Sequence, residues 1–223
     1  MRLCDLLKIE NGVTAVIGSG GKTTLLHALA EELDGKIILC TTTLMYPSKT
    51  CRNAISVSED EIEQMLREQR IICVGEHAER GKIKQSRIPI ETLVKLADYV
   101  LVEADGAKQM PLKAHLAHEP VIPKIANQTI CVVGAMGFGM PIYDAVHRPE
   151  KFAELAETAL QDLATPERVG KVLSTEGLAD RVFVNQVETG QALENAKRLA
   201  QNFDWPVVAG SLKNKKYYKI KTR

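Results

Sequence analysis

The sequence predicts a doubly wound, mainly parallel α/β domain in which layers of helices cover both faces of one sheet. Short apolar runs alternate with stretches of helical spacing, and strands of a covered parallel sheet are apolar along their whole length. A glycine-rich segment joins the first apolar run to the first helical stretch. The length of 223 residues suits one domain, so we expect residues 1–223 to fold as a single unit.

The expected strands are short, mostly apolar runs. They cover residues 13–17, 37–41, 71–74, 99–102, 130–133, 182–184 and 207–209. Between these runs, apolar residues recur at the three- and four-residue spacing of a helix face. The expected helices are 22–33, a helix from 58 onward, 89–97, 150–163, 166–173 and 191–203. Ser58 with Glu61 has capping-box spacing, and Thr165 followed by Pro166 is typical of a helix start.

Some polar segments do not fit this alternation. Residues 76–88 are hydrophilic and basic, and residues 110–124 are interrupted by prolines, so we expect loop excursions that carry specificity. The C-terminal residues 213–223 contain five lysines and one arginine with no acid. We expect this basic tail to be a frayed, solubilising end, and docking on nucleic acid or on an acidic protein is the alternative.

The composition excludes several classes of protein. Lys and Arg total 29 against 28 Asp and Glu, and a net charge of +1 argues against a protein that coats nucleic acid. No apolar run approaches the roughly 20 residues that cross a bilayer, and the first residues lack a signal-peptide core, so we expect a cytoplasmic protein without a membrane partner. The five cysteines are scattered, without metal-site or disulfide spacing.

The most informative segment is a glycine-rich turn between a buried strand and a helix. It consists of Gly18, Ser19, Gly20, Gly21, Lys22, Thr23 and Thr24. Glycines let backbone N–H groups converge on a phosphate, and the helix start adds partial positive charge. Lys22 would reach the β and γ phosphates, and the Thr23 hydroxyl would bind magnesium. The full P-loop pattern has a further glycine at the position of Val16, and a structural turn with a solvated lysine is the alternative.

Acidic residues follow the expected strand 99–102. A P-loop requires a carboxylate near magnesium or the attacking water, at the end of a neighbouring parallel strand. Glu103 is a candidate magnesium ligand, and either Glu103 or Asp105 would orient the water. The Gly106 N–H would meet the γ phosphate, and Lys108 would offset charge in the transition state. A surface turn with a solvated ion pair is the alternative.

Two further strand ends carry polar side chains that suit a nucleotide. Thr41 begins a run of three threonines and is a candidate magnesium ligand, although threonine is also common in strands. Asn185 and Glu188 are candidate nucleotide-binding residues, because 185–188 approximates the N-K-x-D pattern of guanine-reading GTPases. Gln186 replaces the lysine and Glu188 the aspartate, so ATP and GTP both remain open.

Other segments give the chain a family resemblance. The motifs that carry it are 18–24, 41–43, 101–108 with 111–113, 118–123 and 146–150. Over about residues 5–211 the sequence resembles YqeC-type accessory proteins of selenium-dependent hydroxylases. The resemblance implies a P-loop NTPase fold and a role in maturing a molybdenum hydroxylase, by helping to insert, sulfurate or selenate its cofactor. It also singles out His147 and Arg148, and Arg148 would bind an anionic ligand or Glu150.

The histidines at 115 and 118 precede Glu119 and invite a metal site. The surrounding prolines argue against one helix face that holds both rings, so we expect His115 and His118 to be solvated or turn-capping. Lys113 would be a solvated lysine or a contact to a pterin phosphate.

Together these observations predict magnesium-dependent binding and slow hydrolysis of ATP or GTP. The resemblance adds the role of accessory factor for a selenium-dependent molybdenum hydroxylase, with that client protein or its pterin cofactor as partner. Two alternatives stay open. One is a small-molecule kinase or phosphotransferase whose acceptor meets residues 110–124, and the other is a non-catalytic carrier of a phosphate-bearing, pterin-type cofactor.

Overall fold

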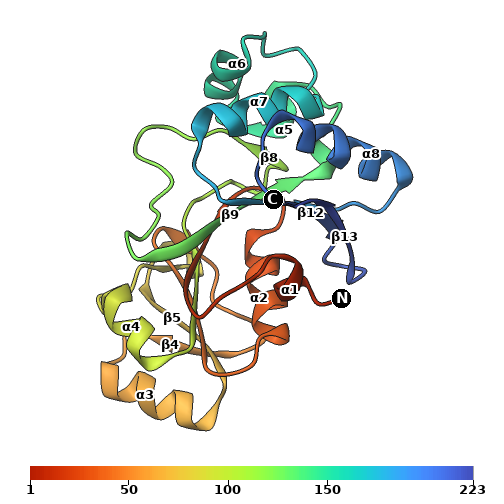
Figure 1. Ribbon diagram of the computed structural model, residues 1–223. Helices are drawn as coiled ribbons and strands as arrows, with labels where there is room; N and C mark the ends of the chain where they lie inside the picture. Colours follow the sequence, from red (N-terminus) through yellow and green to blue (C-terminus); the bar gives the residue numbers. More distant parts are fainter. Residues whose placement is uncertain (223) are drawn as a thin grey trace.

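A computed structural model of the protein describes residues 1–222 and confirms the predicted fold class. The strands are β1 Gly12–Gly18, β2 Ile37–Thr41, β3 Leu44–Met45, β4 Arg52–Ile55, β5 Ile71–His77, β6 Ile83–Lys84, β7 Tyr99–Glu103, β8 Leu112–Lys113, β9 Ala126–Gly134, β10 Val146–His147, β11 Arg181–Asn185, β12 Val207–Ser211 and β13 Lys216–Lys221. The main sheet has 11 strands in the order β13-β12-β11-β9-β1-β7-β2-β5-β6-β3, with β4 paired to β5. Strands β12 and β13 lie side by side, and β4 and β5 lie together far from them (Figure 1). Strands β8 and β10 form a separate two-stranded sheet.

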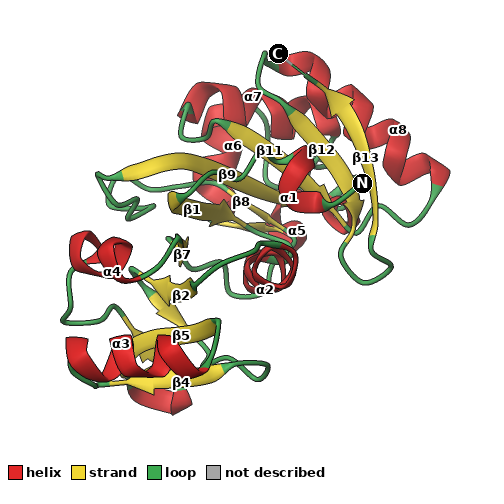
Figure 2. Cartoon of the chain, turned by 60° about the horizontal axis from the view of Figure 1, so that its bottom comes forward, coloured by secondary structure: helices red, strands yellow, loops and turns green. Residues whose placement is uncertain are grey.

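Helices cover both faces of the main sheet (Figure 2). They are α1 Leu3–Leu6, α2 Lys22–Glu32, α3 Glu59–Glu68, α4 Ile90–Leu96, α5 Ile142–Ala145, α6 Pro149–Ala156, α7 Pro166–Glu176 and α8 Gly190–Leu199, with single 3-10 turns at Glu79–Gly81, Ala135–Gly137 and Ala200–Asn202. Side chains alternate between the faces of a strand. In β1, Val16 therefore packs in the cluster formed with α1 and α2, whereas Ala15 and Ile17 pack in the cluster formed with α6, α7 and α8.

All the predicted strands are present in the main sheet, and the central ones pair in parallel. The capping box of Ser58 and Glu61 forms, and the Thr165 hydroxyl accepts a hydrogen bond from the backbone N–H of Arg168. The helix expected over 150–163 is too long, because α6 ends at Ala156. The Asp162 carboxylate accepts from the Thr158 hydroxyl and the Ala159 N–H, which holds a turn in place of a further helical turn.

The basic C-terminal segment corrects a second expectation. Residues Lys216–Lys221 form β13, which pairs antiparallel with β12 as the last strand of the sheet, so this part of the tail is not frayed. Lys216 and Lys219 are exposed, whereas Tyr217 and Ile220 are partly buried. Tyr217 packs edge-on against Phe183, with ring centroids 6.4 Å apart. Tyr217 and Ile220, which lie between the lysines in sequence, therefore anchor the segment to the rest of the protein.

Residues 76–88 also contain regular structure. Strands β5 and β6 pair antiparallel across the turn at Glu79–Gly81, and β6 pairs with β3. The excursion is therefore a hairpin that extends the sheet beyond β5. Across residues 1–222, no helix combines the length and apolar character needed to cross a membrane.

Polar strand ends meet at the carboxyl edge of the sheet. Strand β1 lies between β7 and β9, and β2 lies beside β7, with Val16 opposite Glu103 and Thr41 also opposite Glu103. Ligands of open α/β sheets bind outside the carboxyl ends of strands where neighbouring connections diverge. Here the chain runs from β1 toward β2 on one side, and strands β9, β11 and β12 lie on the other. The glycine-rich turn leaves the sheet at this point.

Candidate functional site

The glycine-rich turn between β1 and α2 follows a path that only glycine tolerates at several positions. Gly18, Gly20 and Gly21 have φ angles of 87°, 90° and 127°. A Cβ atom on Gly20 would overlap the Cα of Gly134 at the end of β9. The backbone N–H of Ser19 donates to the Val132 carbonyl at 2.9 Å, and the Ser19 hydroxyl donates to the Met110 carbonyl. The turn is therefore held tightly against β9.

Lys22 is the first residue of α2, and its side chain folds back over the turn. The Nζ atom donates to the Gly18 carbonyl at 2.8 Å and lies 3.0 Å from Asp105 Oδ1. The residue is 6% exposed. Burial of this ammonium is balanced by the Asp105 carboxylate, and the positive charge is fixed within the turn.

Thr23 and Glu103 bring two oxygen atoms together beside the turn. The Thr23 hydroxyl donates to Glu103 Oε2 at 2.6 Å. Burial raises the pKa of the Glu103 carboxyl, and the charge of Lys22 and the Thr23 hydrogen bond oppose that rise. A hydroxyl and a carboxylate are the hard oxygen ligands that Mg²⁺ prefers, so this pair fits the predicted magnesium site.

Asp105 is buried and held by groups from several parts of the chain. Its Oδ2 accepts from the backbone N–H of Gly18 at 2.9 Å and lies 2.9 Å from His115 Nε2 and 3.4 Å from Lys113 Nζ. Burial alone would raise the pKa of the Asp105 carboxyl. The His115 hydrogen bond and the charges of Lys22 and Lys113 outweigh burial and lower the pKa. Asp105 therefore braces the turn as an anion.

His115 is buried, which corrects the expectation of a solvated or turn-capping ring. Its Nδ1 lies 2.8 Å from Glu176 Oε2, and its backbone N–H donates to the other Glu176 oxygen at 2.6 Å. Burial lowers the pKa of the imidazole, but the hydrogen bonds with Asp105 and Glu176 outweigh burial and raise it. A protonated ring donates to both carboxylates, so His115 links the turn to the end of α7.

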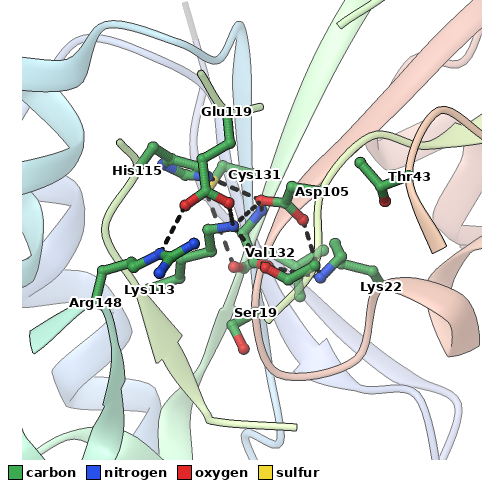
Figure 3. Close-up of polar contacts among 12 residues, drawn as sticks. Ser19, Lys22, Thr43, Asp105, Lys113, His115, Glu119, Cys131, Val132 and Arg148 are labelled. Atoms are coloured by element: carbon green, nitrogen blue, oxygen red, sulfur yellow. Dashed lines mark hydrogen bonds and ion pairs between the residues drawn. The ribbon is translucent and has the colours of Figure 1, made fainter. Parts of the chain in front are cut away.

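Lys113, Glu119 and Arg148 form a second chain of ionic contacts beside Asp105 (Figure 3). The Lys113 side chain is 0% exposed, and its amine donates to the Gly106 carbonyl at 2.6 Å and to Glu119 at 2.7 Å. Arg148 donates from Nε to the other Glu119 oxygen at 2.9 Å. The expectations of a solvated Lys113 and of a contact between Arg148 and Glu150 are therefore wrong, since both cations share Glu119.

The other sequence candidates hold the backbone together. The Thr41 hydroxyl donates to the Glu103 carbonyl at 2.8 Å and accepts from the Thr43 N–H. Asn185 donates to the Gly20 carbonyl at 2.8 Å and accepts from the Leu212 N–H at 3.1 Å. Glu188 is exposed and accepts from the Ser211 hydroxyl. Thr41, Asn185 and Glu188 do not line the cleft described next.

A cleft of about 900 Å³ opens over this edge of the sheet. Of the sequence candidates it is lined by Ser19, Gly20, Gly21, Lys22, Thr23, Thr24, Glu103, Gly106, Lys108, His147 and Arg148. A cavity of about 880 Å³ lies at the opposite edge, near Gly35, Lys36 and Asp98. The lining of that cavity contains no glycine-rich turn comparable to residues 18–21. The first cleft is therefore the better candidate for a phosphate-binding site.

The spacing of residues in the sequence did not predict the ionic contacts beside the cleft. His115 and Glu176 are 61 residues apart, and Arg148 and Glu119 are 29 residues apart. Separations of this size leave no local pattern. A signal was present in the prolines and charges of 110–124, which mark a segment that is not an ordinary helix.

Comparison with known proteins agrees with the motifs. A protein of Escherichia coli (strain K12), described as uncharacterized protein YqeC, is 35% identical over 158 residues, which are 64% of this chain and 60% of that protein. The matched region thus spans less than two thirds of that relative's length. The model of a family described as YqeC protein matches residues 14–150, a shorter stretch than the 5–211 of the resemblance. Since this match covers more than half of the 223 residues, the chain belongs to the YqeC family.

Proposed function

We propose that this protein binds a nucleoside triphosphate with Mg²⁺ in the cleft and hydrolyses it slowly. The observation that carries the proposal is the meeting of three groups at one sheet edge: the glycine turn, the Lys22 ammonium and the Thr23–Glu103 oxygen pair. A phosphate needs converging N–H groups and positive charge, and magnesium needs hard oxygen ligands. The glycine turn and Lys22 meet the requirements of a phosphate, and the Thr23–Glu103 pair beside them meets those of magnesium.

The roles follow from the contacts. Gly20 and Gly21 line the cleft at the start of α2, where backbone N–H groups and the helix dipole favour an anion. Lys22 supplies the charge that neutralises the phosphates. Thr23 and Glu103 would hold Mg²⁺, which when bound neutralises charge that develops on the phosphate oxygens. The Thr41 hydroxyl already bonds to backbone groups, so we assign no metal contact to it.

Glu103 is the better candidate for positioning the attacking water. It lines the cleft and has only the Thr23 hydroxyl as a side-chain hydrogen-bond donor among the described residues. Asp105 is 0% exposed and is surrounded by the Gly18 N–H and by cations. We therefore propose that Glu103 orients the attacking water and that Asp105 positions the glycine turn and Lys22.

The biological setting that we propose is accessory work for a selenium-dependent molybdenum hydroxylase. The motifs of the resemblance and membership of the YqeC family support it. Slow hydrolysis would then change the conformation of loops that contact the client protein or its pterin cofactor. The protein would act in the cytoplasm with either ATP or GTP.

The first experiment tests the glycine turn. Replacement Lys22→Ala should abolish binding of Mg–ATP and Mg–GTP, measured by titration calorimetry on the full chain. Loss of at least a hundredfold in affinity corresponds to about 2.8 kcal/mol. Lys36→Ala is the matched control, because Lys36 lines the cavity of similar size at the opposite edge. Unchanged affinity in Lys22→Ala would remove the turn from nucleotide binding.

A second candidate function is transfer of the phosphoryl group to a small molecule. The observation that favours it is the extent of the cleft, which reaches from Lys22 to His147 and Arg148. Consumption of ATP that depends on an added acceptor would distinguish a transferase from a hydrolase.

A further inference from the structure

The part of the cleft lining that lies outside the glycine turn includes several basic side chains. It is built from β10, from the residue that precedes α6 and from the segment between β7 and β8. The side chains that it contributes to the cleft include Lys108, His147 and Arg148. The nucleotide contacts proposed above do not use His147 or Arg148, and a cleft of about 900 Å³ is near the upper end of the roughly 300–1,000 Å³ that binds small molecules.

Arg148 is held in one position, and within the described part of the chain its terminal amino groups remain free to donate hydrogen bonds to a ligand. Its backbone has a φ of 70°, and its Nε donates to Glu119, which the buried Lys113 amine fixes from the other side (Figure 3). Neither terminal amino group of Arg148 donates to another of the described residues, 1–222. A guanidinium in this state presents a planar fork to an anion, with little further loss of side-chain freedom.

His147 stands next to this fork and is also fixed. Its backbone belongs to β10, and its carbonyl accepts from the Ala114 N–H at 3.1 Å, so the β8–β10 sheet sets its place. The residue is 9% exposed and lines the cleft. Burial, together with the nearby charges of Lys113 and Arg148, lowers the pKa of the ring. A neutral imidazole offers one donor and one acceptor to a ligand.

The local charge favours an anion. Glu119 contacts Arg148 and also Lys113, which it shares with Asp105. Lys108 also lines the cleft, and its positive charge contributes to the lowered pKa of the His147 ring. The Lys108 and Arg148 charges are not needed to balance Asp105, which has Lys22, Lys113 and His115 as partners.

Two methionines give the same cleft an apolar surface. Met136 and Met140 line the cleft and are 68% and 38% exposed. Methionine side chains adapt to flat rings, and their sulfur atoms make favourable contacts with aromatic edges.

We propose that this part of the cleft lining binds a second ligand beside the nucleotide, an organic anion whose phosphate or carboxylate contacts Arg148 and His147 and whose flat ring contacts Met136 and Met140. The inference rests on the proposed function only in that the nucleotide fills the other half of the cleft. It adds a co-ligand of stated chemistry to the nucleotide site.

The test uses phenyl phosphate and benzoate as probes, with phenol as the uncharged ring. The full chain is first saturated with magnesium and the imido analogue of ATP or GTP, whichever binds more tightly, so that the glycine turn is filled. Titration followed by NMR should then show one site for at least one of the two anions and none for phenol. Arg148→Gln should weaken that binding at least tenfold.

Arg168→Gln is the matched control, because Arg168 is 33% exposed in its side chain against 35% for Arg148 and also pairs with a carboxylate, but lies outside the cleft. Equal affinity in Arg148→Gln and the parent protein, or no binding of either anion, would overturn the proposal. Repeating the titration on Lys22→Ala without nucleotide separates the two ideas. Binding that persists there and depends on Arg148 supports the second site even if the nucleotide site fails, and binding lost in Lys22→Ala alone would place the anion in the glycine turn.

Discussion

At the scale of single residues, the two carboxylates that follow β7 have opposite surroundings although they are two positions apart. Glu103 lines the cleft and accepts from one threonine, and its pKa is raised by burial. Asp105 turns inward to the Gly18 N–H, Lys22, Lys113 and His115, and its pKa is lowered. Within a strand, residues two positions apart lie on the same face, but β7 ends at Glu103. The change of chain direction after the strand therefore separates a carboxylate that lines the cleft from one that holds the glycine turn.

This separation leads to a prediction for Glu103→Gln. The amide keeps the size of the side chain and a contact with Thr23, so nucleotide affinity should change little. Phosphate release in a single turnover should slow by about a hundredfold, the usual contribution of a group that accepts a proton. Glu188→Gln is the control, since Glu188 also accepts from one hydroxyl but lies outside the cleft. Equal rates in Glu103→Gln and the parent would shift the role to Asp105.

The buried His115 predicts a pH dependence of folding. Its pKa is raised in the folded protein above the ordinary value of about 6.5. Its contribution to stability is therefore complete below about 6.5 and is lost as the pH rises through the folded pKa. His115→Gln should lower the free energy of unfolding by about 3 kcal/mol near pH 6, because it breaks a buried ion pair. The deficit should shrink as the pH is raised toward about 9, above the ordinary pKa.

Chemical denaturation of the two proteins across this range measures the difference. His118→Gln serves as the control, because His118 lies in the same segment but is exposed. A deficit that stays constant with pH would show that His115 contributes through packing and not through its charge.

At the scale of elements, the strands that a sequence reveals are those with a continuous apolar run. Strand β2 has the bounds that were predicted, and β1 and β7 extend only slightly beyond them. The two-residue strands β8 and β10 are too short to contain an apolar run. They form only because residues 112–113 pair with residues 146–147, which are distant in the sequence. These short strands place Lys113 and His147, so elements without a sequence signal position His147 in the cleft lining and Lys113 beneath it.

Strand β11 illustrates how an element's end can act on a distant loop. Asn185 donates to the Gly20 carbonyl and accepts from the Leu212 N–H, and so joins the glycine turn to the end of β12. A Cβ on Gly21 would lie 2.5 Å from the Asn185 amide nitrogen, which shows how closely the two segments pack. The sequence suggested a residue that contacts nucleotide directly, whereas the contacts found here are to the backbone.

Asn185→Ala should consequently weaken nucleotide binding, because the glycine turn would lose the hydrogen bond that fixes the Gly20 carbonyl. Loss of two buried hydrogen bonds costs about 1–3 kcal/mol, and we expect affinity to fall by about tenfold. Calorimetric titration and thermal unfolding would record the two effects. Asn53→Ala is the control, because Asn53 also joins two backbone groups, both of Ser48, far from the cleft. Nucleotide affinity reduced equally in both variants would mean that the effect is general destabilisation.

At the scale of the whole molecule, the sequence reveals layers better than it reveals connections between them. Apolar periodicity predicted the sheet and its covering helices, and the glycine-rich turn together with the end of β7 predicted Lys22, Thr23 and Glu103 as one group. The link from Asp105 through His115 to Glu176 on α7 could not be predicted in this way, since it depends on the packing of α7 against the sheet. Local patterns predict which residues lie at an edge, and only the assembled fold shows which of them touch.

The position of β13 has one more consequence. The outermost strand of a sheet offers unpaired backbone groups to any extended chain that approaches it, and lysines along such a strand discourage that addition. Lys216 and Lys219 stand exposed on β13 at the end of the main sheet. Lysines at these positions would therefore disfavour the addition of a strand from a second copy of the chain at β13.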